Sequence, residues 1–149
     1  MQPMVRTKVT HDPSSMEGQA YLPRVLLYEV ETTGSGAATL FTAAPGTYIH
    51  EVVGVVMEAF DTNTTIDVGD EDSASCFIAN NEWTESTQYQ IATSKQTTAT
   101  DGKYYSAHKN ITVAVAGATP TTGKLVLMFF VYNLVEMDTQ GYNASKTIP

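Results

Sequence analysis

The sequence predicts an all-β protein, an antiparallel β-sandwich or jelly roll with extended N- and C-terminal arms. Short apolar segments alternate with turn residues, and no segment keeps a helical period over three turns. Thr, which suits a pleated strand and disfavours a helix, is frequent among the polar residues. The 149 residues can form one core and are too few for two ordinary domains.

β-favouring segments bounded by Gly, Pro, Asn or Asp predict strands at residues 24–31, 38–43, 48–60, 64–68, 88–92, 110–117 and 124–136. The segment 48–60 is apolar on both faces in its middle, as a central strand requires. Strict alternation there places Ile49 beside Glu51 on one face, and Gly54 marks a bulge or a close approach. The last two segments predict a hairpin.

The predicted organisation is an N-terminal arm at 1–23, a β-sandwich domain at 24–136 and a C-terminal tail at 137–149. The arm mixes Pro, Gly and polar residues without a sustained period, and such arms need a partner to become ordered. Within the arm, Tyr21 and Leu22 are expected interaction residues.

Composition excludes several classes of function. The net charge of −8 and the absence of a basic run argue against nucleic acid, since phosphate binding needs clustered Lys and Arg. The longest apolar stretch, 125–131, is too short to span a bilayer, and no secretory signal is recognisable, so we expect synthesis in a cytoplasm. The single cysteine, Cys76, excludes an internal disulfide and predicts a buried reduced thiol.

The acidic turn formed by Asp67, Asp70, Glu71 and Asp72 is the strongest metal candidate in the sequence. Hard cations such as calcium need several carboxylate oxygens brought together by a tight Gly-containing turn. The turn lacks the regular Asp spacing and the distal Glu of a calcium loop, so a solvated acidic turn is the simpler interpretation. We predict no catalytic residue, no cofactor and no enzymatic activity.

Trp83, between Glu82 and Glu85, raises the possibility of a carbohydrate site. A Trp face can stack on a sugar, and two carboxylates can serve as acid and as nucleophile or base. On a strand, however, residues three apart point to opposite faces, so the two carboxylates would not converge. A packing or subunit-contact role for Trp83 is the better interpretation.

The segments YIHEVVGVVMEAFDTNTTIDVGD and NITVAVAGATPTTGKLVLMFFVY together carry a family resemblance. A long apolar strand ends in an aromatic-Asp turn, and a short strand with a Val-Gly-Asp turn and a terminal pair of apolar strands follow. This arrangement, over residues 48–132, resembles accessory structural proteins of tailed bacteriophages.

The resemblance implies a virion protein such as a capsid decoration (cement) protein, with a sandwich body often arranged as a trimer. We expect such a protein to stabilise the head shell through subunit contacts and through its N-terminal arm. Its partners would be the major capsid protein or other virion proteins, with no nucleic acid and no membrane. A tail, neck or head-fibre component is the alternative within the virion. A carbohydrate-binding module or depolymerase is the alternative of another class.

Overall fold

The computed structural model describes residues 4–9, 24–31, 34–61, 63–94, 102–117 and 120–134. Its strands are β1 (Met4–Val9), β2 (Arg24–Glu31), β3 (Gly36–Ala43), β4 (Thr47–Glu58), β5 (Thr65–Asp70), β6 (Ile91–Thr93), β7 (Lys103–Tyr105), β8 (Lys109–Ala116) and β9 (Lys124–Asn133), with a 3-10 turn, η2 (Asn80–Glu82). No helix in these described ranges is long and apolar enough to cross a membrane.

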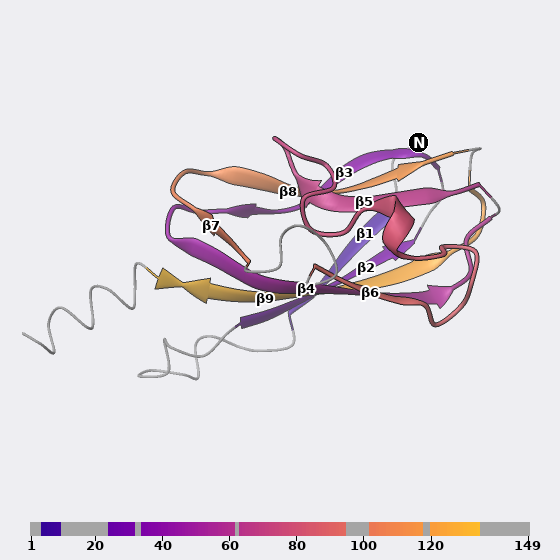
Figure 1. Cartoon of the computed structure of the whole chain (residues 1–149), viewed down its shortest axis with the longest axis horizontal. Helices are drawn as coiled ribbons and strands as arrows, with labels where there is room; N and C mark the ends of the chain where they lie inside the picture. The colour runs from indigo at the N-terminus through magenta and orange to yellow at the C-terminus, as the bar shows by residue number, and fades with distance from the viewer. Residues whose placement is uncertain are drawn as a thin grey trace, which may run out of the picture.

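The strands form two antiparallel sheets that pack face to face (Figure 1). Sheet A has the order β1-β2-β9-β4-β6, with β7 also paired to β4, and sheet B has the order β3-β8-β5. Every named strand pair is antiparallel. The predicted fold class, an antiparallel β-sandwich, is therefore confirmed.

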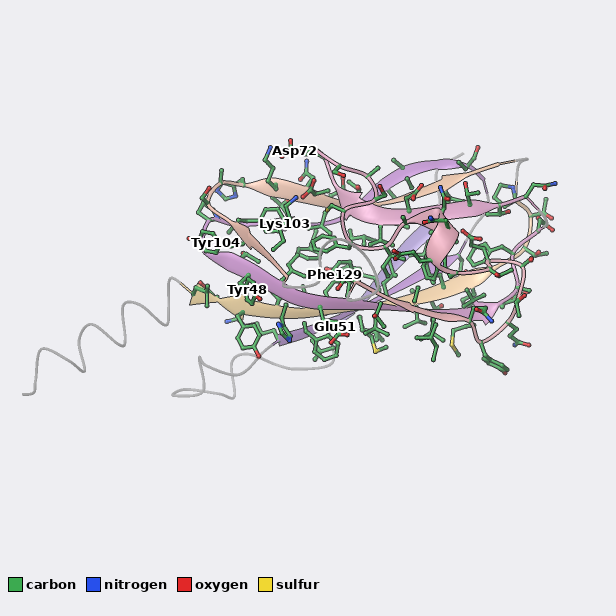
Figure 2. The ribbon with its side chains drawn as sticks, in the orientation of Figure 1. Tyr48, Glu51, Asp72, Lys103, Tyr104 and Phe129 are labelled. Carbon is green, nitrogen blue, oxygen red and sulfur yellow. The ribbon has the colours of Figure 1, made fainter. Side chains whose placement is uncertain are left out.

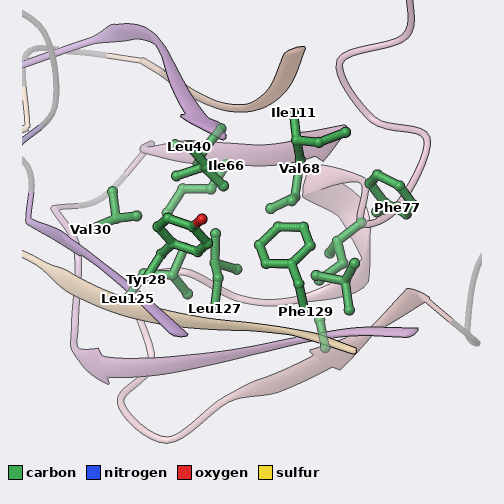
Figure 3. Packing of buried hydrophobic residues seen from close by; sticks show 14 of the residues in the cluster. Tyr28, Val30, Leu40, Ile66, Val68, Phe77, Ile111, Leu125, Leu127 and Phe129 are labelled. Atoms are coloured by element: carbon green, nitrogen blue, oxygen red, sulfur yellow. The ribbon is translucent and has the colours of Figure 1, made fainter. Parts of the chain in front are cut away.

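The core lies between the sheets and is centred on Phe129 of β9 (Figure 3). Its ring meets Phe41 edge-on at a centroid distance of 5.3 Å, Tyr28 at 5.8 Å and Phe77 at 6.3 Å. These residues come from β3, β2 and the loop after β5, so one side chain links both sheets and a loop. Edge-to-face contacts of this kind add to the free energy gained from burial alone.

Two of the three register shifts in the described strands decide which side chains enter this core. In β4 the register shifts between Ile49 and Glu51, so His50 is the extra residue and Ile49 joins the buried face with Val52. The strict alternation predicted for this strand is therefore wrong at Ile49, because a bulge inserts one residue and reverses the faces beyond it. A second bulge, between Thr39 and Phe41 of β3, brings Leu40 and Phe41 to the core together.

The predicted hairpin of the last two strands is wrong. β8 is the central strand of sheet B, between β3 and β5, whereas β9 lies in sheet A between β2 and β4. Each of these strands is buried on its core face and flanked on both edges. Their alternation is thus that of two central strands, and the loop that joins them crosses from one sheet to the other.

Part of the predicted N-terminal arm belongs to a sheet. β1 pairs with β2 along its whole length, from Met4 opposite Glu31 to Val9 opposite Leu26. The remainder of the arm, with Tyr21 and Leu22, lies outside the described residues, as does the predicted tail at 137–149. The predicted strand at 88–92 is found slightly later, as β6.

Phe129 and Phe130 provide a matched pair for testing this core. Phe129→Ala removes a fully buried ring and should lower the free energy of unfolding by about 3–5 kcal/mol. Phe130→Ala removes a partly exposed ring from the other face of the same strand and should cost clearly less. Urea denaturation measures both values, and equal losses would contradict the assignment of the two faces.

Candidate interaction surface

The outer face of sheet A is the candidate interaction surface, because its middle is apolar across three strands. Strand register aligns side chains in rows across β2, β9 and β4. The apolar members, all partly exposed, are Val25, Leu27, Val53, Val55, Val126, Met128 and Phe130. Contiguous apolar surface of this kind, bordered by polar residues, marks interaction sites in soluble proteins.

Polar and aromatic side chains border this face. Glu51 lies on the outer side of sheet A, whereas Phe129 points between the sheets (Figure 2). At one end Tyr48, His50 and Tyr132 form a ring cluster with centroid distances of 6.1 to 6.3 Å. At the other end Lys124 pairs with Glu29 and Glu31, and Met57 and Ile91 are 40% and 58% exposed.

Trp83 and Glu85 have a structural role at the edge of sheet B. The indole N–H of Trp83 donates a hydrogen bond to the carbonyl of Ile66 at 3.0 Å. The backbone N–H of Ile66 donates to the Glu85 carboxylate at 2.9 Å. Both side chains therefore complete the hydrogen bonds of β5 at its outward edge. Burial raises the pKa of Glu85 above its usual value of 4.5, against the opposing effect of its backbone hydrogen bonds.

The Trp83 ring is not available for stacking on a sugar. The side chain is only 5% exposed, and its six-membered ring occupies the space above Gly54 of β4, where a Cβ would lie 2.4 Å from Cζ3. Gly54 thus marks a close approach and not a bulge, since the register is regular there. Burial of Trp83 removes the platform on which the carbohydrate interpretation depended.

The acidic turn is organised around Asp70, whose side chain is fully buried. Its carboxylate accepts hydrogen bonds from Lys103 Nζ at 2.5 Å, from the Tyr105 hydroxyl at 2.8 Å, and from the backbone N–H groups of Asp72 and Ser73 at 3.0 Å. Burial alone would raise the pKa of Asp70, but the hydrogen bonds from Lys103, Tyr105 and Ser73 outweigh it and lower the pKa to about 2. The cluster therefore ties the turn after β5 to β7.

The other carboxylates of this turn have partners of their own. Asp67 accepts from the backbone and side chain of Asn80, and Asp72 pairs with Lys109 at 2.9 Å. Among the residues that the structure describes, no group of three or more His, Cys, Asp or Glu side chains is placed to hold a metal ion. The three carboxylates considered as a calcium candidate have separate partners: Asp67 binds Asn80, Asp70 binds Lys103, and Asp72 binds Lys109.

Cys76 lies half-buried beside this cluster, with Sγ 3.8 Å from Lys103 Nζ. Burial and the nearby Asp70 carboxylate raise the pKa of the thiol to about 11, which Lys103 only partly opposes. The thiol is therefore protonated at neutral pH, and a nucleophilic role has no support.

Sequence reasoning did not single out the outer face of sheet A. The signal was present, because both faces of the segments 48–60 and 124–136 are apolar. That pattern fits either burial in the core or a trimer interface, and burial in the core was the preferred interpretation. Among the described residues, sheet B covers only one face of sheet A.

The buried Asp70 carboxylate should make the free energy of unfolding decrease at acidic pH. A folded pKa of about 2, below the ordinary 3.8, stabilises the fold above pH 4, and this stabilisation is lost as pH falls towards 2. The difference corresponds to about 2 kcal/mol. Asp70→Asn should lose this amount at pH 7 and show a flatter profile between pH 5 and 2.

The matched control for that experiment is Asp72→Asn on the same turn, since the Asp72 side chain is 62% exposed. Urea unfolding at a series of pH values should show that the free energy of unfolding of this variant decreases at acidic pH as it does in the wild type. An Asp70→Asn profile parallel to that of the wild type would contradict the role of the buried carboxylate.

Comparison with known proteins shows similarity of fold. No protein-family model and no curated protein sequence matches the chain. A chain in the acidic stable capsid structure of Helicobacter pylori bacteriophage KHP30 matches with a TM-score of 0.60 and 16% identity, over 87% of this chain and 93% of that one.

Two further capsid structures contain similar chains. In the cyanophage Pam1 capsid the TM-score is 0.53 at 18% identity, over 83% of this chain and 97% of that one. In the capsid of Ralstonia phage GP4 it is 0.52 at 14% identity, over 79% and 88%. Most of the chain, and not one motif, is therefore similar in fold to chains found in phage capsids.

Proposed function

We propose that this chain is a structural virion protein of a bacteriophage, and that it decorates the head shell as a cement protein. The observation that carries the proposal is the fold, which similar chains in three phage capsid structures share over most of their length. The residue pattern that resembles accessory proteins of tailed phages supports the same role. The protein would be made in the host cytoplasm and act in the virion.

The outer face of sheet A is the surface that we assign to shell contact. It presents partly exposed apolar side chains on the central strands β9 and β4, whose backbones are fixed on both edges. A rigid apolar face loses little conformational entropy on docking, which favours affinity. The major capsid protein is the proposed partner, with other virion proteins as alternatives.

Self-association would add to this contact. We favour a homotrimer, in which interfaces of about 1,600 Å² repeat around the axis. Tyr21 and Leu22, which precede β2 in the sequence, are the arm residues that we expect to contact a neighbouring chain. Trp83 contributes indirectly, by fixing the edge of β5.

Binding to shells tests the proposal directly. Purified protein mixed with empty capsids that lack it should pellet with them in co-sedimentation. Met128→Lys places a charge in the middle of the outer face of sheet A and should weaken binding about tenfold or more, as hot-spot substitutions do.

Thr112→Lys is the matched control, because Thr112 has the equivalent central position in β8 of sheet B. It should bind as the wild type does, and thermal melts should show that both variants fold. Wild-type protein that stays in the supernatant would contradict shell binding. If labelled protein instead appears on tails or necks by electron microscopy, the tail-component alternative replaces decoration.

A further inference from the structure

The edges of the two sheets differ in whether their outward backbone groups are hydrogen-bonded, and this difference points to an interaction site. At the outward edge of β5, the groups of Ile66 pair with Trp83 and Glu85, those of Val68 pair with Phe77 and Ile78, and the N–H of Asp70 pairs with Ser73. At the edge of β4, β7 and β6 pair at the two ends and Ser94 accepts the N–H of Val52 between them. One lateral side of the sandwich is therefore fully hydrogen-bonded.

The edge of β3 differs, because no described strand pairs with it, although β1 of sheet A lies close to β3. Ile66 and Val68 direct their backbone N–H and C=O groups away from β8, so they form non-hydrogen-bonded pairs with Val115 and Val113. In such an antiparallel pair both residues direct these groups away from each other, so the groups of Val115 and Val113 point towards β3. Their partners Gly36 and Ala38 consequently face β8.

The alternate residues of β3, Ala37, Thr39 and Thr42, direct both backbone N–H and C=O to the outside, and their side chains are exposed. No described residue forms a strand pair or a backbone hydrogen bond with this edge. The chain thus presents a row of donors and acceptors at the spacing that a further strand requires.

This edge also lacks the charged side chains that usually protect an edge strand against strand addition. Natural edge strands carry Lys, Pro or inward charges, or are covered by other elements. Residues 32–49 contain no charged side chain, although the chain has 8 basic and 16 acidic residues. The bulge in β3 directs Leu40 and Phe41 into the core and leaves only Ala and Thr side chains outside.

We propose that β3 pairs antiparallel with β3 of a second copy of this chain. The edge is both donor and acceptor, so a two-fold pair satisfies both copies with the same residues, and Thr side chains form favourable cross-strand pairs. Two chains of net charge −8 can approach most closely where neither is charged, and this edge offers nothing to a partner that is recognised by charge.

The proposed pairing is self-limiting. It would join two copies of sheet B into one continuous sheet with β5 at each end, and the outward edge of β5 is already hydrogen-bonded. The result is a closed assembly and not a filament. The contact is independent of the virion role, and a trimer formed through other surfaces would leave this edge free to link two trimers.

Amide hydrogen exchange on the wild-type protein tests the pairing residue by residue. The amides of Ala37, Thr39 and Thr42 should exchange rapidly in dilute solution and become protected as protein concentration rises, while the amide of Ala38, which faces β8, stays protected throughout. Rapid exchange of the three amides at every concentration would overturn the proposal. Slow exchange at every concentration that persists in the Thr39→Lys variant would also overturn it, since a segment of the same chain would then occupy the edge.

Charge placed on the edge provides a second test. Thr39→Lys brings like charges together in the two-fold pair, so light scattering should give half the wild-type mass at the same concentration. Thr65→Lys, on the hydrogen-bonded edge strand β5 of the same sheet, is the control and should keep the wild-type mass. An unchanged mass for Thr39→Lys overturns the proposal. So does loss of capsid binding in this variant without a change of mass, which would assign the edge to a capsid strand.

Discussion

The contact between Trp83, Gly54 and Ile66 is the constraint on which the arrangement of the two sheets depends. The ring packs on the one position of β4 that has no side chain, and the indole N–H bonds to the carbonyl of Ile66 in the opposite sheet. A larger residue at position 54 would expel the ring, and a residue without the N–H would leave a buried carbonyl unpaired. The loop from β5 to β6 consequently runs along this side and hydrogen-bonds its edges, so the opposite side is where sheet B remains open.

The fold class and the central character of residues 48–60 could be predicted, because burial imposes period-2 patterns that the sequence carries directly. The pairing of β8 and β9 with different sheets could not. Two adjacent central strands have the same alternation as a hairpin, and only the long-range pairing of β8 with β3 and of β9 with β2 distinguishes them. Ile49 was misplaced for a related reason, since the bulge at His50 leaves no mark on the residue pattern.

The site residues show the same division between local and long-range information. The acidic turn was visible from its composition, but the partners of Asp70 are Lys103 and Tyr105, more than thirty positions away in the sequence. Trp83 was expected to pack or to contact a subunit. Its place between the sheets follows from Gly54, which the sequence marked only as a bulge or a close approach. The outer face of sheet A became apparent only when sheet B was seen to cover one side.

These features describe a sandwich with two distinct surfaces, the apolar outer face of sheet A and the uncharged edge of β3. The first suits binding by surface area and the second suits strand pairing. Cryo-electron microscopy of capsids that carry the protein would test this account most directly, because the map gives the orientation of the two sheets. We predict sandwich-shaped density on the shell, with the outer face of sheet A against the capsid protein and Tyr48, His50 and Tyr132 at the contact. Density with sheet B against the shell, or a shell without added density, would contradict it.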